Sequence, residues 1–400
     1  MLPSKDSDTF SIYVDLKDGS SINQTKEVTS CIASNLQKNE NIKNISVFLK
    51  EGQPLDFAAL VKQSALKDKE SQAEMMVNIK RFEDREITSY NLISQLRSEV
   101  QKNCSSYDAN IKFIELPAGP PVLASIVTEI YGGNSFENRR DFALKIAQIL
   151  KNQATLVDID ILADDDFIVY ELELDNNKVI ISNADLEQIK NTLFLAFEGM
   201  KVSVINQKNA QNEIPIFLRL DDSRLLKNSS KDDLKVKLQN LKVINNLGNM
   251  VSISEFVTIK ESLKEPTITS KNLNMMINVI AETNKNSQIY PLLNSRDEMI
   301  KSLSTDYEIT KTDMLNLSFI DKKTEEKFDL VFDGELKVTI DTFIDLGGAF
   351  IIALVLIFFL MVMYYKSFAI SAGIVLSSFI SIIGVIFAHV IMDLITADTF

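Results

Sequence analysis

The carboxy-terminal stretch LGGAFIIALVLIFFLMVMYY (346–365) contains no charged residue. Lys366 follows it, and then comes a second uncharged stretch, SFAISAGIVLSSFISIIGVIFAHVIM (367–392). A helix needs about 20 consecutive apolar residues to cross the hydrocarbon core of a bilayer, and each stretch is long enough. The sequence therefore predicts a transmembrane helical hairpin, 346–365 and 367–392, that follows a long polar region.

The polar region carries nearly all of the net charge. The whole chain has a formal net charge of -13. Lys366, Asp393 and Asp398 are the charged residues of the tail, so the tail contributes little. An acidic surface repels phosphate backbones and anionic lipid, and we therefore expect no nucleic-acid partner. A region as long as residues 1–345 exceeds one ordinary core and predicts several subdomains.

Side chains that carry enzymatic or metal chemistry are scarce. His389 is the single histidine and lies in the second apolar stretch, and Cys31 and Cys104 are the two cysteines. This excludes a His/Cys metal site in the polar region, and no Gly-rich phosphate loop is present. The acidic run 164–166 is more typical of a solvated turn than of a cation site. We expect no enzymatic activity, no cofactor and no bound metal.

Hydrophobic periodicity divides the polar region into strand–helix–strand segments. Alternating apolar residues predict strands over 10–16, 45–49, 75–79 and 111–116, and a four-residue spacing predicts helices over 28–36 and 92–100. Two such segments in succession predict a ferredoxin-like βαββαβ subdomain. The breaker-rich segment LPAGPP (116–121) predicts a rigid connector after it.

A second βαββαβ pattern follows and is interrupted. Its first half is predicted as a strand at 126–131, a helix at 142–150 and a strand at 156–162. Its second half is predicted as a strand at 267–280, a helix near 290–303 and a strand that begins at Tyr307. The intervening residues contain their own helix (189–197) and strand (214–220). The predicted fold class is therefore α+β, with two ferredoxin-like subdomains, a domain inserted into the second, and a transmembrane hairpin.

Small residues share one face of the second predicted membrane helix. They are Gly373, Ser377, Ser381, Gly384 and Ala388. Small side chains allow two helix backbones to approach closely in a membrane. This face predicts packing against a helix of a larger bundle, with packing against the first helix of the same hairpin as the alternative.

Several segments resemble the resistance-nodulation-division (RND) efflux permeases of the acriflavine-resistance type. The similar segments are LPAGPPV (116–122), EIYG (129–132), DGE (333–335) and KSF (366–368). The resemblance runs nearly end to end and implies the second half of such a permease. On this basis residues 9–119 resemble the first porter subdomain and residues 120–172 with 267–341 the second. Residues 173–266 resemble the inserted docking domain, and the hairpin resembles the eighth and ninth transmembrane helices.

The resemblance also implies location and partners. Residues 1–345 are expected to be periplasmic and the hairpin to lie in the bacterial inner membrane, as part of a longer permease. The expected partners are the remaining transmembrane helices, two further copies in a homotrimer, a periplasmic adaptor, an outer-membrane channel and small-molecule substrates. The expected function is proton-driven export of hydrophobic or amphiphilic compounds, although the proton-relay helices of the family lie outside this chain. The alternative is a membrane-anchored periplasmic binding or scaffold module without transport activity.

A substrate path and the cysteine state complete the expectations. The loop that contains Pro54, Phe57 and Leu60 resembles the flexible substrate loop of the first porter subdomain, with pinning of the loop to the core as the alternative role of Phe57 and Leu60. In such a fold Cys31 and Cys104 lie on helices that share one face of the sheet. Because one cysteine is in mid-helix and the other at a helix end, we expect two free, partly buried thiols rather than a disulfide.

Overall fold

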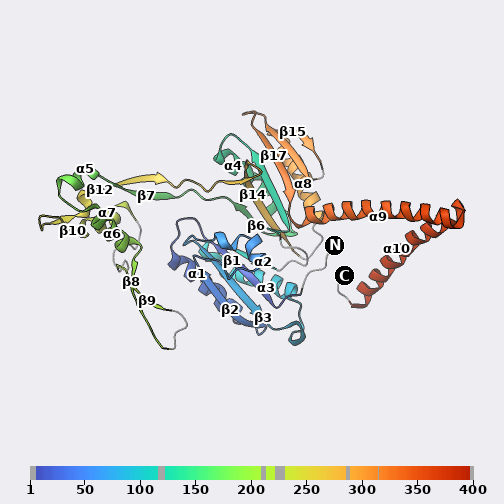
Figure 1. Ribbon diagram of the computed structural model, residues 1–400, viewed down its shortest axis with the longest axis horizontal. Coiled ribbons are helices and arrows are strands. Elements are labelled where there is room, and N and C mark those ends of the chain that lie inside the picture. Colours follow the sequence, from blue (N-terminus) through green and yellow to red (C-terminus); the bar gives the residue numbers. More distant parts are fainter. Residues whose placement is uncertain are drawn as a thin grey trace. The chain divides into compact units, whose positions relative to one another are not determined.

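A computed structural model describes residues 6–115, 122–208, 213–220, 230–284, 289–313 and 315–396. The connector 116–121 lies outside these residues. The chain divides into two compact units. One is Asp166–Glu265, and the other combines Met1–Asp165 with Pro266–Phe400. Figure 1 labels many of the elements of both units, and each unit is described by itself below.

The larger unit begins with a four-stranded sheet, called here the first sheet. Its strands have the order β2-β3-β1-β4, and all neighbours are antiparallel. With two intervening helices this is the ferredoxin-like βαββαβ arrangement that the sequence predicts. The elements are β1 (Thr9–Asp15), α1 (Ile22–Leu36), β2 (Ile42–Leu49), β3 (Gln72–Ile79), α3 (Ser89–Asn103) and β4 (Asn110–Ile114). Short helices in the connections are α2 (Phe57–Val61), η1 (Ser64–Leu66), η2 (Phe82–Asp84) and η3 (Ser105–Tyr107).

The two faces of the first sheet differ in chemistry. Alternate residues of β1, such as Phe10, Ile12 and Val14, join side chains of α1 and α3 in a buried apolar core. A capping box begins α1, in which the Ser21 hydroxyl accepts a hydrogen bond from the Gln24 N–H. The residues between them on β1, Ser11, Tyr13 and Asp15, must point to the opposite face because side chains alternate along a strand. That opposite face is polar.

The second sheet has seven strands. The order is β13-β14-β5-β17-β16-β15, and β6 also pairs with β14. Its elements are β5 (Ile126–Gly132), α4 (Phe136–Lys151), β6 (Leu156–Leu162), β13 (Thr269–Lys271), β14 (Asn274–Thr283), α8 (Ile289–Leu303), β15 (Tyr307–Thr312), β16 (Asn316–Asp321) and β17 (Lys327–Asp333). The ferredoxin-like set is β6-β14-β5-β17, and β15 and β16 extend it. An aromatic cluster fills its core, where the Phe142 and Phe328 rings stack with centroids 4.5 Å apart.

Two strand predictions in the second sheet are wrong in detail. The predicted strand 267–280 is two strands, because Asn272 and Leu273 both take positive φ values and turn the chain into a β13–β14 hairpin. The predicted last strand at Tyr307 is an edge strand, β15, and the place of the fourth ferredoxin-like strand is taken by β17. Hydrophobic alternation marks both as strands but does not specify which neighbour each one pairs with.

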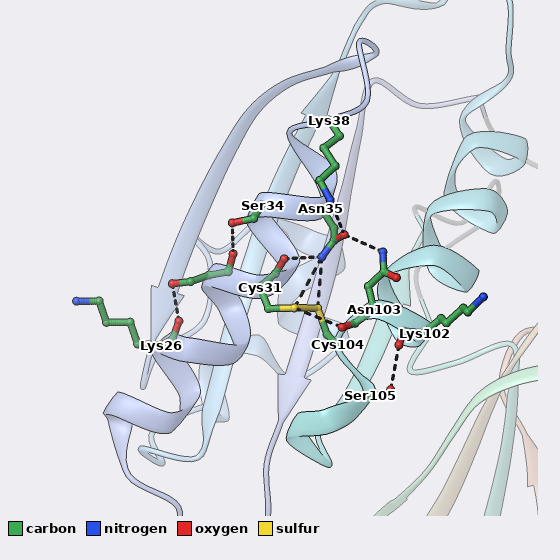
Figure 2. The surroundings of a disulfide bond; sticks show 10 residues. Lys26, Cys31, Ser34, Asn35, Lys38, Lys102, Asn103, Cys104 and Ser105 are labelled. Atoms are coloured by element: carbon green, nitrogen blue, oxygen red, sulfur yellow. Dashed lines mark hydrogen bonds between the residues drawn. A yellow bond between two sulfur atoms is a disulfide. The ribbon is translucent and has the colours of Figure 1, made fainter.

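The prediction of free thiols is also wrong. Cys31 and Cys104 form a disulfide, with their Cα atoms 6.2 Å apart. Figure 2 shows the Asn35 amide beside it, donating to the Cys31 carbonyl at 2.9 Å and lying 3.7 Å from each sulfur. The expectation failed because α3 ends beside the middle of α1, so that a mid-helix and a helix-end cysteine meet. The bond ties together the two helices that cover the first sheet.

The smaller unit, Asp166–Glu265, has its own core. Its elements are β7 (Ile168–Leu174), α5 (Asn176–Ile181), α6 (Leu186–Phe197), β8 (Met200–Ile205), β9 (Ile214–Leu218), α7 (Lys231–Asn240), β10 (Lys242–Ile244), β11 (Met250–Ser252), η4 (Ile253–Glu255) and β12 (Val257–Leu263). Strands β7 and β12 pair antiparallel over their full length, so the chain enters and leaves the unit along one ribbon. Ile189, Leu238 and Phe256 lie in the core of the unit.

Two long helices follow the second sheet. They are α9 (Glu335–Tyr365) and α10 (Phe368–Thr396), joined by a turn in which Lys366 has a φ of 50°. Among the described residues, the segment Lys337–Tyr365 is long and apolar enough to cross a membrane. Two shorter apolar segments, Phe368–Ser377 and Ile383–Met392, lie within α10. Two membrane crossings therefore remain a prediction for this helical hairpin.

Candidate substrate pocket

A cavity of about 50 Å³ lies on the polar face of the first sheet. Met76 and Ile114 contribute apolar atoms to its wall, and Ser11 and Tyr13 contribute hydroxyl groups. The connection between β2 and β3 supplies the other side of the cavity through Gln53, Asp56, Ala59 and Lys62. The cavity thus has the mixed lining of sites that bind organic molecules, but its volume is well below the roughly 300–1,000 Å³ of sites that enclose a drug-sized ligand, so it has room for only part of such a molecule.

The chain segment 53–64, called here the pocket loop, is closed at both ends. At Gly52 a Cβ atom would lie 2.2 Å from the carbonyl oxygen of Ser64, so only glycine permits this approach of the two backbones. Within the loop, the Asp56 carboxylate accepts a hydrogen bond of 2.7 Å from the Ala59 N–H and so begins α2. The pocket loop is therefore a compact loop whose ends lie close together.

Glu74 on β3 lies beneath the ends of the pocket loop and has 0% exposure. Its Oε2 accepts a hydrogen bond of 3.2 Å from the Gln53 N–H, and its Oε1 accepts one of 3.1 Å from the Ser64 hydroxyl. The Tyr13 hydroxyl lies 2.9 Å from the same Ser64 oxygen. Burial raises the pKa of Glu74, and the Gln53 N–H and the charge of Lys67 oppose that rise.

A second buried network continues along the same face. Lys112 on β4 is 4% exposed and its ammonium lies 2.8 Å from the Asp15 carboxylate. Lys67 also pairs with Asp15, at 3.5 Å, and Lys112 pairs in addition with Asp160 on β6 of the second sheet. Burial alone would raise the pKa of Asp15, but the two ammonium groups prevail and lower it to about 2.

Ion pairs join the first sheet to the second within the larger unit. Lys62 of the pocket loop binds Glu282 on β14 at 3.2 Å and donates to the Leu123 carbonyl at the same distance. Arg97 on α3 binds Asp158 on β6 at 3.2 Å. The wall of the cavity is therefore attached to both sheets through polar contacts.

The predicted substrate-path residues lie on the pocket loop. Pro54 and Leu60 are exposed, and Leu60 keeps 57% of its surface in solvent. Phe57 is the first residue of α2, and its side chain lies outside the described part of the structure. Pro54 and Leu60 are not among the described residues that line the cavity, although their neighbours Gln53, Asp56 and Ala59 are. Their role in a substrate path remains a prediction.

The small-residue face of α10 is open in this chain. Gly373, Ser377, Ser381, Gly384 and Ala388 are all exposed. A Cβ atom added at Gly373 or Gly384 would meet no atom within 4 Å. The alternative of close packing against α9 therefore has no support at these two glycines, and packing against another helix stays a prediction. His389 contacts only its own helix among the contacts described, with Nδ1 2.9 Å from the Val385 carbonyl oxygen.

The acidic run 164–166 is engaged in contacts with protein. Asp164 pairs with Lys69 at 2.6 Å and accepts hydrogen bonds from the N–H and hydroxyl of Thr267. Among the described residues no group of three or more His, Cys, Asp or Glu side chains is arranged to hold a metal ion.

Sequence inspection missed Glu74, Tyr13 and Lys112. All three occupy the polar positions of alternating strands, a pattern that normally marks a solvent-facing surface. In the structure the pocket loop and the second sheet cover that surface, which local alternation does not reveal. The one available signal was the density of charged residues on strands of a single sheet.

The sequence matches the profile of the AcrB/AcrD/AcrF family over residues 1–397. The chain belongs to this family of RND efflux permeases. Its fold resembles that of two solved structures, both described as a heavy metal efflux pump, in crystal forms II and I. The TM-scores are 0.67 and 0.63, each at 15% sequence identity. The likeness covers 94% and 90% of this chain but 35% and 34% of the pump chains, so this member of the family spans about a third of their length. No curated protein matches the chain.

Family membership confirms the resemblance on which the sequence interpretation rests. The α+β fold with two ferredoxin-like sheets is that of an RND permease. The chain is therefore a membrane protein of the RND permease family.

Proposed function

We propose that this RND permease segment forms part of a proton-driven exporter that moves hydrophobic or amphiphilic compounds from the periplasm or inner membrane toward an outer-membrane channel. The chain contributes walls of the substrate path and carries out no chemical step of its own. The observation that carries the proposal is the cavity beneath the pocket loop, where Met76 and Ile114 lie beside the carboxylates of Asp56 and Glu115. Apolar surface with a few charged groups suits one end of an amphiphilic organic molecule, and the small cavity has room for no more than that.

Sulfur chemistry supports an organic cargo over a soft metal ion. Thiolate and thioether ligands select ions such as Cu⁺. Both cysteines are consumed in the disulfide, and Met76 is the one methionine among the described residues that line this cavity. The two similar pumps are described as heavy metal exporters, but at 15% identity that likeness concerns the fold alone.

The disulfide supports the proposed location of the first sheet. Disulfides persist in oxidising compartments such as the bacterial periplasm and are rare in the cytosol. We therefore place the residues before α9 in the periplasm and the hairpin in the inner membrane. Homotrimer formation, an adaptor protein, an outer-membrane channel and further transmembrane helices belong to the same proposal.

Export by the complete permease tests the function. The permease that contains this chain is expressed in bacteria lacking their own exporters, and intracellular accumulation of a fluorescent amphiphilic dye is measured beside tolerance to Cu⁺ and Ag⁺. We expect lower dye accumulation and unchanged metal tolerance. Increased metal tolerance without dye export would overturn the organic cargo. Dye binding without any export would favour the scaffold alternative.

A matched pair of variants tests the pocket loop in the same assay. Leu60→Asn changes an exposed leucine of the loop, and Leu66→Asn changes a similarly exposed leucine of η1 outside it. We expect reduced export from the first variant and normal export from the second. Phe57→Ala provides an independent change at the start of α2. Normal export by both Leu60→Asn and Phe57→Ala would remove these residues from the substrate path.

A further inference from the structure

The buried carboxylate of Glu74 has a role that ordinary core packing does not explain. A carboxylate taken fully out of water is costly unless its oxygens are hydrogen-bonded. Glu74 is 0% exposed, and both of its oxygens are engaged. One partner is Tyr13, its cross-strand neighbour on β1. The other two are the ends of the pocket loop, Gln53 and Ser64.

The contacts around Glu74 converge on those loop ends. Oε2 binds the Gln53 backbone and Oε1 binds the Ser64 hydroxyl, so one side chain bridges the beginning and the end of the loop. Ser11 on β1 adds a hydrogen bond of 2.9 Å to the Gln53 side chain. Tyr13 on the same strand contacts Ser64. Each end of the loop is thus fixed to the sheet, and Glu74 is the residue common to both ends.

The loop between these ends contributes much of the cavity wall. Asp56, Ala59 and Lys62 all line the cavity and all lie between Gln53 and Ser64. Their positions relative to Met76 and Ile114 on the sheet depend on where the loop ends are held. A shift at the ends therefore changes the shape of the cavity without altering any lining side chain.

We propose that Glu74 is a positioning residue that holds the pocket loop against the first sheet and thereby sets the affinity of the cavity for its cargo. This rests on the proposed export function. Glu74 contacts the loop and is not among the residues that line the cavity, so its effect on cargo is indirect. Binding sites need such supporting contacts to keep the contacting groups in place.

Three substitutions test whether the Glu74 carboxylate, rather than another contact, holds the ends of the pocket loop. Glu74→Gln keeps the shape but replaces one acceptor oxygen with a donor amide, so it can no longer accept from both loop ends. Ser64→Ala removes one of the two links and keeps the carboxylate. Gly52→Ala displaces the loop end from the opposite side, because the new Cβ would collide with the Ser64 carbonyl. Glu70→Gln is the control, since Glu70 is exposed and its carboxylate binds the Ile22 N–H rather than the pocket loop.

The first measurement is loop mobility in the complete permease and does not depend on transport. A nitroxide is attached at Leu60→Cys, where the side chain is exposed, and its spectrum is compared with that of a label at Val47→Cys on β2. We expect Glu74→Gln and Gly52→Ala to increase mobility at position 60 and to leave position 47 unchanged. Unchanged mobility at position 60 in both variants would overturn the proposal.

The second measurement is the concentration dependence of dye export. Loss of one or two loop-end hydrogen bonds should raise the half-saturating dye concentration about three- to tenfold. The maximal rate should remain within about twofold, because a positioning contact alters binding more than turnover. Ser64→Ala should give a smaller shift in the same direction and Glu70→Gln none. A lower maximal rate of export at an unchanged half-saturating dye concentration would contradict the proposal. If the unmodified permease exported no dye, the proposed export function would be wrong, and the mobility measurement alone would decide the role of Glu74.

Discussion

The two ferredoxin-like sheets use the same connection for different purposes. In the first sheet, the chain between the second and third strands of the motif, β2 and β3, holds the pocket loop. In the second sheet, the equivalent chain between β6 and β14 contains the whole compact unit Asp166–Glu265. A connection that leaves from an edge of the sheet tolerates insertion, because the entropy of closing a loop grows slowly with its length.

Both connections close on a carboxylate. In the first sheet Glu74 bridges Gln53 and Ser64. In the second sheet Asp164 accepts hydrogen bonds of 2.8 and 2.7 Å from the N–H and hydroxyl of Thr267, across the two ends of the inserted unit. When the two ends of a connection are held together, the sheet can accommodate connections of very different length. The sheets differ in how they are stabilised, since the first has a disulfide between its helices and the second has an aromatic core.

The largest expected effect concerns the aromatic core of the second sheet. Phe142→Ala removes a ring that is 1% exposed and stacks on Phe328. Truncation of a buried phenylalanine lowers the free energy of unfolding by about 3–5 kcal/mol. Urea denaturation of the chain in detergent measures the loss, with Leu144→Ala, an exposed residue of the same helix, as the control. A loss below about 1 kcal/mol would show that this cluster does not hold the second sheet.

The next effect tests the disulfide that distinguishes the first sheet. Replacing Cys31 and Cys104 together with Ser removes the link between α1 and α3, which are 73 residues apart at the bridged positions. We expect a loss of about 2–4 kcal/mol in the free energy of unfolding, confined to the first sheet. Hydrogen exchange of β1 and β17 locates the change in each sheet. If the amides of β1 and β17 lost protection against hydrogen exchange to the same extent, the two sheets would not be stabilised independently of each other.

The sequence predicted the repeated elements better than their partners. Alternation at 10–16 and the four-residue spacing at 28–36 are local signals, and β1 and α1 formed where they indicated. The β13–β14 hairpin was missed because Asn272-Leu273 is not a common sequence for a turn that needs two positive φ values. The disulfide and the Glu74 contacts were missed because they depend on where chain segments distant in sequence meet. For the candidate pocket the sequence pointed to a loop that lies over the cavity but not to the strand residues beneath it, and a substrate role for that loop stays a prediction.

A smaller expected effect is a change of stability with pH, in which Asp15 and Glu74, two carboxylates of the polar face, act in opposite directions. The pKa of Asp15 is lowered to about 2 in the folded protein, below its usual value of about 3.9. A lowered folded-state pKa gives stability that is complete above the unfolded value and is lost as pH falls from about 4 to about 2. Thermal unfolding at pH 4, 3 and 2 should therefore show a steeper decline for the unmodified chain than for Asp15→Asn. Glu74 carries the opposite sign, because its raised pKa favours the protonated form on folding.

The ion pairs of Asp15 are the expected source of this acid sensitivity. Lys67 and Lys112 pair with Asp15, and Asp160 is a second partner of Lys112. If Asp15→Asn declined as steeply as the unmodified chain, the acid sensitivity would arise from other carboxylates and the ion pairs of Asp15 would contribute little.

The smallest expected effect tests whether the connections are interchangeable. Replacing Asp166–Glu265 with a short Gly-Ser turn shortens the β6–β14 connection while Asp164 and Thr267 keep their contact. While β7 and β12 stay paired, they hold the two ends of the insertion together, so the loop to be closed is only about two to three doublings longer than the short turn. At about 0.6 kcal/mol for each doubling, the stability of the larger unit should change by no more than about 1–2 kcal/mol. Thermal unfolding of the shortened chain in detergent, with the β5 amides followed by hydrogen exchange, measures this. Asp164→Ala in the full chain is the matched variant, because it releases the ends and leaves the insertion in place. The contrary result would be that the β5 amides lose protection against hydrogen exchange in the shortened chain but keep it in Asp164→Ala. The second sheet would then need the inserted unit in order to fold. The two connections would be alike in topology only.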